Sequence, residues 1–134
     1  GSANKPVIHT YRTIYGIDLV IANQNTTLKK LRELYKFDNE ELTEEILSGY
    51  ATTSTVINKA TKRNSILVKL NNSPFPKDSD KKLELVNTAA HEATHVLLDI
   101  YSHVGETISY CSQESIGYFI GWATEMIYKC ATTK

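Results

Sequence analysis

The sequence predicts an α+β fold in a single domain that spans residues 1–134. Three observations predict it. β-Branched and aromatic residues fill two runs near the N-terminus, two further β-prone runs flank a polar segment in the middle, and two long helical patterns occupy the C-terminal part. The chain has no internal repeat or low-complexity tract. We therefore expect N-terminal strands and a helix, then a β-hairpin, then two C-terminal helices.

The N-terminal strands are predicted within residues 7–21, where Gly16 and Asp18 interrupt the β-prone run. The pattern allows one long bent strand or two short ones, and residues 17–22 carry the stronger signal. N-cap residues and leucines at helical spacing then predict an amphipathic helix over residues 25–37. The acidic stretch that follows predicts a second short helix, which ends at Gly49.

The hairpin is predicted from β-prone residues at 51–57 and 65–70, joined by a wide polar loop. A long helix follows, capped at Asp78 or Ser79 and ending near Tyr101. Its apolar side comprises Leu85, Val86, Ala89, Ala93, Val96, Leu97 and Ile100, and its other side carries Glu84, Thr88, His91 and His95.

The last helix is predicted over residues 112–130. Its apolar side comprises Ile116, Phe119, Ile120, Ala123, Met126, Ile127 and Cys130. Gly117 and Gly121 lie opposite that side, next to Glu114. Because glycine is unfavourable inside a helix, we expect these two to let the preceding helix pack closely.

Charge and cysteine content limit the partners and the compartment. With 15 Lys+Arg against 15 Asp+Glu the chain carries no formal net charge, which argues against nucleic acid or a membrane surface and favours peptide or protein partners. Cys111 and Cys130 lie near opposite ends of one predicted helix and cannot bridge each other, which favours a reducing, cytoplasmic compartment. Gly1 and Ser2 resemble the remnant of a cleaved tag, so a targeting signal could have been removed.

The segment His91-Glu92-Ala93-Thr94-His95 is an H-E-x-x-H motif inside a predicted helix. Histidines at i and i+4 lie one above the other on a helix, so two imidazoles can converge on one zinc ion. Glu92 projects about 100° away, where it can take a proton from a metal-bound water. The motif predicts a zinc site with Glu92 as the general base of a hydrolase.

A catalytic zinc usually has three protein ligands, and the motif supplies two. Leu98 and Tyr101 occupy the positions at which a metzincin has its glycine and third histidine, so that layout is absent. Glu114 is the preferred candidate for the third ligand. The alternatives are Glu106, Glu125, His103 and Cys111, and a helix-capping role would explain Glu114 without a metal.

His91, Glu92, His95 and Glu114, with 18 residues between the last two, resemble the gluzincins, the thermolysin-like clan of zinc peptidases. The resemblance implies a glutamate ligand on the helix after the motif. That clan's N-E-x-x-S-D signature is incomplete here, because Gly117 and Tyr118 stand where Ser-Asp is expected. A hairpin followed by the motif helix is also similar to small ImmA/IrrE-type and phage-encoded metallopeptidases.

The residues around the motif supply the remaining candidates. Tyr110, Tyr118 and His103 could donate a hydrogen bond to the developing oxyanion. Thr88 and Asp99, one turn either side of the histidines, could orient them. An edge strand at 51–57 or 65–70 could hold an extended substrate.

The sequence thus predicts a small zincin-like domain that acts as a zinc-dependent peptidase. The alternatives are a non-catalytic zinc-binding protein with closed coordination, and a protein-interaction module that keeps the peptidase fold without needing the metal.

Overall fold

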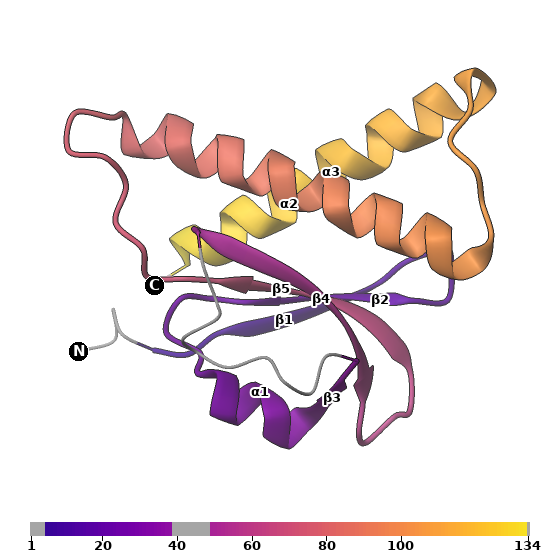
Figure 1. The fold of residues 1–134 in the computed structure, drawn as a ribbon, viewed down its shortest axis with the longest axis horizontal. Coiled ribbons are helices and arrows are strands. Elements are labelled where there is room, and N and C mark those ends of the chain that lie inside the picture. The colour runs from indigo at the N-terminus through magenta and orange to yellow at the C-terminus, as the bar shows by residue number, and fades with distance from the viewer. Residues whose placement is uncertain (1–4, 39–48, 134) are drawn as a thin grey trace.

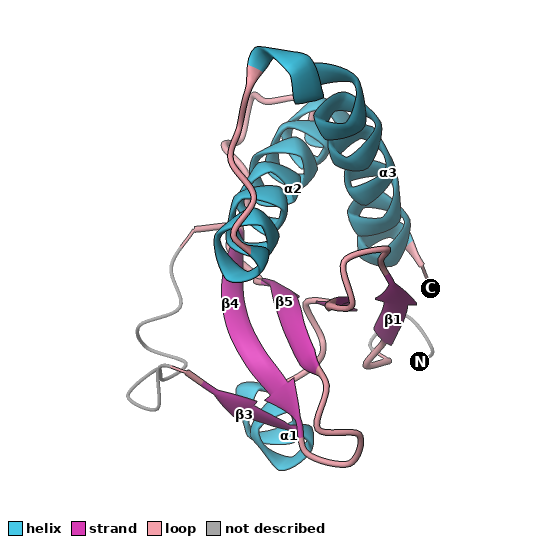
Figure 2. Cartoon of the chain, turned by 90° about the vertical axis from the view of Figure 1, so that its right-hand side faces the viewer, coloured by secondary structure: helices cyan, strands magenta, loops and turns pink. Residues whose placement is uncertain are grey.

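The computed structural model describes residues 5–38 and 49–133. Within these ranges the chain forms a mixed five-stranded sheet in the order β1-β2-β5-β4-β3. The long helices α2 and α3 pack together over one face of the sheet, and the short helix α1 lies against the opposite face (Figure 1 and Figure 2). The α+β class predicted from the sequence is confirmed.

The N-terminal strands are two antiparallel partners, β1 (Ile8–Arg12) and β2 (Asp18–Ala22). The turn between them includes Gly16 at a φ of 74°, a left-handed conformation that glycine adopts without steric cost. Of the two predicted arrangements, the pair of short strands is therefore the correct one.

Strand β2 is central and pairs in parallel with β5 (Asn64–Leu70). Because successive side chains point to opposite faces, β2 contributes to two cores. Leu19 and Ile21 pack beneath α2 and α3, whereas Val20 and Ala22 pack with α1 on the other side. Burial on both faces explains why the β2 sequence is continuously apolar after Asp18.

Helix α1 (Leu28–Leu34) begins at Thr27, whose hydroxyl accepts the backbone N–H of Lys30. The prediction that this helix continues to Phe37 is wrong, because Tyr35–Phe37 forms strand β3 and pairs with the end of β4. Tyr35 and Phe37 are buried in the core beneath the sheet, and this packing overrides the helical spacing. The second short helix, predicted at 38–49, lies outside the described residues except for its two ends.

The predicted hairpin is confirmed as β4 (Ala51–Asn58) and β5, which pair antiparallel. Strand β5 has β4 on one edge and β2 on the other, so the hypothesis that 65–70 offers a free edge is wrong. In β4 the outer edge pairs with β3 only at residues 56–58. No described strand pairs with the outer edge of residues 51–54.

Helices α2 (Lys81–Val104) and α3 (Gln113–Thr132) match the two predicted helices, although α2 is capped by Asp80 rather than by Asp78 or Ser79. The predicted apolar residues of α2 are buried from Ala89 onward, and Leu85 is half-buried. Val86 is 45% exposed, so its assignment to the core is wrong. Val86 lies in the first two turns of α2, in which no residue is buried.

Cys111 is exposed, Cys130 is buried and both are free thiols, as their predicted separation requires. In residues 5–38 and 49–133 no helix combines the length and the apolar character that a membrane span requires.

Candidate metal site

The middle of α2 carries the motif histidines. The Asp80 carboxylate accepts the backbone N–H groups of Lys82 and Leu83 at the start of the helix, and Gly105 ends it in a left-handed conformation. His91 and His95 therefore lie in regular helix, well away from both ends. Both side chains are exposed.

The two imidazoles converge. Their Nε2 atoms are 3.1 Å apart and the ring centroids 4.8 Å apart. Glu92 is close by, with Oε2 3.9 Å from His91 Nε2. Within the described part of the chain, these three side chains form the group whose potential ligand atoms all lie within 4.8 Å of one another.

The spacing of the two nitrogens suits zinc. With Zn–N bonds of about 2.0–2.1 Å and a tetrahedral angle, two ligand nitrogens are separated by about 3.3 Å. The observed 3.1 Å is close to that separation, so the imidazoles could hold a zinc ion with little rearrangement. Without a metal, the same two nitrogens can share one proton in a hydrogen bond.

Glu92 is 5% exposed and points toward strand β4 rather than into solvent. The Thr53 hydroxyl donates a hydrogen bond of 3.0 Å to Glu92 Oε1, which fixes one carboxylate oxygen and leaves the other toward His91. Sequence reasoning missed Thr53. The alternation in β4 places Thr53 on the same face as Ala51, but only the tertiary structure shows that α2 covers this face.

A cavity of about 250 Å³ lies next to this group. Its walls come from the start of β4 and from α2. It is lined by Gly49, Tyr50, Ala51, Asn87, Thr88, His91 and Glu92. Tyr50 and Asn87 were not predicted as site residues. Asn87 precedes His91 by one turn of α2, so helix spacing could have found it. No short-range signal marks Tyr50, because its relation to the motif depends on how β4 packs against α2.

The two residues predicted to orient the histidines lie near them. Thr88 is 8% exposed and lines the cavity, and its hydroxyl has no hydrogen-bond partner among the described residues. Asp99 follows His95 by one turn. Burial raises the pKa of Asp99 above its usual value, while the charge of His95 acts in the opposite direction.

The three predicted oxyanion donors lie elsewhere. Tyr110 is 85% exposed in the short 3-10 helix Tyr110–Ser112, and His103 is exposed in the last turn of α2. Tyr118 is exposed and lines a separate cavity with Tyr15 and Trp122. The structure does not bring any of them into the cavity beside His91.

Glu114 lies in the exposed first turn of α3 and does not belong to the histidine group. Helix α2 continues nine residues beyond His95, about 13 Å at 1.5 Å per residue. The Tyr15 ring contacts both Tyr101 and Phe119, so α3 begins beside the last turns of α2. Glu114 therefore lies beside the C-terminal end of α2, far from the two histidines.

The alternative ligands Glu106, Glu125, His103 and Cys111 are also outside the group.

The prediction that Gly117 and Gly121 let the preceding helix pack closely is wrong, since a Cβ atom at either position would have no neighbour within 4 Å. Both glycines are exposed on α3.

The site is thus two converging histidines, a buried and oriented glutamate, and a cavity beside them. The chain matches no protein-family model, no curated protein and no solved structure.

Proposed function

We propose that the protein is a zinc-dependent peptidase of the zincin type, in which His91 and His95 bind the metal and Glu92 is the general base. The observation that carries the proposal is the geometry of the three side chains. The two Nε2 atoms are at zinc-ligand separation, and the glutamate between them in sequence is buried, oriented and directed toward the same place.

The roles of the residues follow from their positions. A bound zinc ion would polarise the scissile carbonyl and lower the pKa of water at the site. Glu92 accepts a proton from that water through its oxygen facing His91 and later donates it to the leaving amine. Thr53 holds the other oxygen, so the carboxylate need not reorient during the reaction.

The outer edge of β4 supports a peptide substrate. Residues 51–54 have no partner on this edge among the described strands, and Thr53 of this segment contacts Glu92. An extended peptide could add to this edge by main-chain hydrogen bonds, which would place its backbone beside the metal site. The first of the two candidate edges from the sequence is the one that the topology supports.

The geometry argues against a closed structural zinc site. Such sites use four protein ligands, whereas the described group contains three side chains, one of which is already hydrogen-bonded to Thr53. Positions on the metal would remain for water and substrate. The resemblance to gluzincins implies Glu114 as the third ligand, but Glu114 lies outside the histidine group, and metal titration of Glu114→Ala decides between the two.

Zinc content and peptide cleavage test the proposal together. We expect about one zinc per chain and cleavage of a mixed peptide library that stops on chelation and returns with zinc. His91→Ala should lose both properties, whereas His9→Ala, which removes a histidine on β1, should keep both. A protein that binds no zinc even after reconstitution would refute the peptidase and favour the interaction module.

A further inference from the structure

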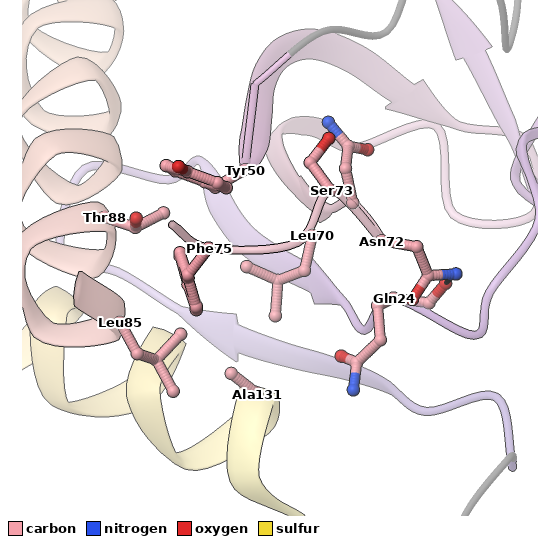
Figure 3. Close-up of a pocket in the computed structure, with 10 residues that line it drawn as sticks. Gln24, Tyr50, Leu70, Asn72, Ser73, Phe75, Leu85, Thr88 and Ala131 are labelled. Atoms are coloured by element: carbon pink, nitrogen blue, oxygen red, sulfur yellow. Dashed lines mark hydrogen bonds between the residues drawn. The ribbon is translucent and has the colours of Figure 1, made fainter. Parts of the chain in front are cut away.

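A second cavity lies next to the metal site, between the start of β4, the segment after β5, and helices α2 and α3 (Figure 3). We call it the Tyr50 pocket. Its volume is about 210 Å³. It is lined by Gln24, Tyr50, Leu70, Asn71, Asn72, Ser73, Phe75, Leu85, Thr88 and Ala131.

The Tyr50 pocket adjoins the cavity beside the histidines. Tyr50 and Thr88 line both, and the cavity beside the histidines also includes His91 and Glu92. A group bound in the Tyr50 pocket would therefore be adjacent to a peptide bond placed at the metal site. This is the position of a side-chain pocket that selects the residue flanking the cleaved bond.

The walls of the pocket combine apolar and aromatic side chains with uncharged polar ones. The rings of Tyr50 and Phe75 are tilted against each other with centroids 4.5 Å apart, and Leu70 and Leu85 face the same space (Figure 3). No lining residue carries a charge at neutral pH. A charged side chain would lose its hydration here without gaining a counter-charge, so the pocket disfavours it.

Some polar groups of the lining make no hydrogen bond within the described residues. The Thr88 hydroxyl belongs to a side chain that is 8% exposed, and it has no hydrogen-bond partner among the described residues. The side-chain amide of Gln24 likewise makes no hydrogen bond to the rest of the described chain. Both groups face the cavity and are available to hydrogen-bond a ligand there, because a threonine hydroxyl and a glutamine amide can each donate and accept.

The size limits the ligand further. A volume of about 210 Å³ corresponds to roughly seven waters at about 30 Å³ each, which is room for one large side chain. We propose that the Tyr50 pocket is the specificity pocket of the peptidase and selects an uncharged side chain with a hydrogen-bonding end, tyrosine or glutamine, next to the scissile bond. This inference rests on the proposed function.

The test first maps the cleavage preference with a peptide library and then measures kcat/KM of the parent and of Thr88→Val on two matched peptides. Cleavage products of a peptide library should show tyrosine or glutamine at one fixed position beside the cut, with aspartate, glutamate, lysine and arginine excluded there. For two peptides that differ only by tyrosine or phenylalanine at this position, Thr88→Val should lower kcat/KM for the tyrosine peptide about tenfold or more. The phenylalanine peptide should change less than about threefold, because it has no hydroxyl to lose a partner.

Two controls accompany this comparison. Thr124→Val removes a hydroxyl from α3 that bonds within its own helix, and it should leave both peptides unchanged. Zinc content and circular dichroism should be the same in all variants. Equal losses of kcat/KM for the tyrosine and phenylalanine peptides, or cleavage with no preference at the flanking position, would overturn the pocket assignment. Neither result would contradict the proposed peptidase activity.

A binding measurement separates the two proposals if no peptide is cleaved. Backbone amide signals of Tyr50 and Thr88 should shift in NMR spectra on titration with N-acetyltyrosinamide, and should not shift with N-acetylglutamate. Selective binding without any cleavage would refute the peptidase and retain the pocket as a site for the same side chains. Absence of selective binding would overturn the pocket itself.

Discussion

Thr53 of strand β4 donates a hydrogen bond of 3.0 Å to Glu92 of helix α2, and this contact joins the sheet to the proposed base. The two residues are 39 positions apart in the sequence. Because Glu92 is buried, its carboxylate depends on this donor for one of its oxygens. The contact makes the packing of α2 on β4 part of the proposed catalytic arrangement.

The Thr53 hydroxyl is expected to position Glu92. Thr53→Val removes the donor with little change of shape, and kcat should fall about 10- to 100-fold with a smaller effect on KM. Thr53→Ser should restore most of the activity because it returns the hydroxyl. Thr55→Val, on the same face of β4, serves as the control. Steady-state kinetics on one peptide measures all four proteins, and an unchanged kcat in Thr53→Val would contradict the assignment.

Glu92→Gln separates metal binding from turnover. The amide keeps the size of the side chain but cannot act as a base, so kcat should fall at least about 100-fold while the zinc content stays near that of the parent. Elemental analysis and kinetics on the same preparation make the comparison. Retention of substantial activity would remove Glu92 from the role of base.

Glu114→Ala tests the third ligand. The resemblance to gluzincins implies that Glu114 binds the metal, whereas the structure places it in the first turn of α3, outside the histidine group. From this geometry we expect zinc affinity to stay within about threefold of the parent, compared with a loss above about 100-fold in His91→Ala. Competition with a chromophoric chelator measures both, and a tenfold or larger loss in Glu114→Ala would restore it as a ligand.

Phe37→Ala tests strand β3. Phe37 is buried in the core beneath the sheet, and its truncation should lower the free energy of unfolding by about 3–5 kcal/mol. Leu34→Ala removes a residue that is 37% exposed in α1, so it should cost less, about 1 kcal/mol. Urea unfolding compares the two variants. Similar small losses in both would mean that β3 is not packed as described.

The two thiols should react differently. Burial raises the pKa of Cys130 from 9.0 to about 11, whereas Cys111 is exposed. At pH 8 a thiol reagent should label one cysteine per native chain and two after denaturation. Because the unfolded Cys130 releases its proton first, its ionisation should lower stability as pH rises from about 9 to about 11. Rapid labelling of both native thiols would contradict the buried position.

Much of this arrangement was predictable from local pattern. Helix α2 follows from a long apolar periodicity, and the spacing of His91 and His95 within it makes their convergence a property of helix geometry. The hairpin of β4 and β5 follows from two β-prone runs around a polar loop. The confirmed elements are therefore those whose signal lies within about 25 consecutive residues.

Only the tertiary structure decided which strands pair with each other. The parallel pairing of β2 with β5 joins Asp18 to Ser65, and Arg63 binds the Asp18 carboxylate through two hydrogen bonds of 2.9 and 3.0 Å. Local pattern does not encode which strand pairs with which, because pairing depends on burial across the whole sheet.

The same reason explains the residues that sequence reasoning missed. Thr53 and Tyr50 are ordinary polar or aromatic residues in their own segments, and they become site residues only because β4 packs beside α2. The sequence by itself determined the two histidines, the glutamate and the helix that aligns them. The tertiary structure decided what orients the glutamate, which strand edge is open and where a substrate side chain can fit, because each of these depends on contacts between segments far apart in the chain.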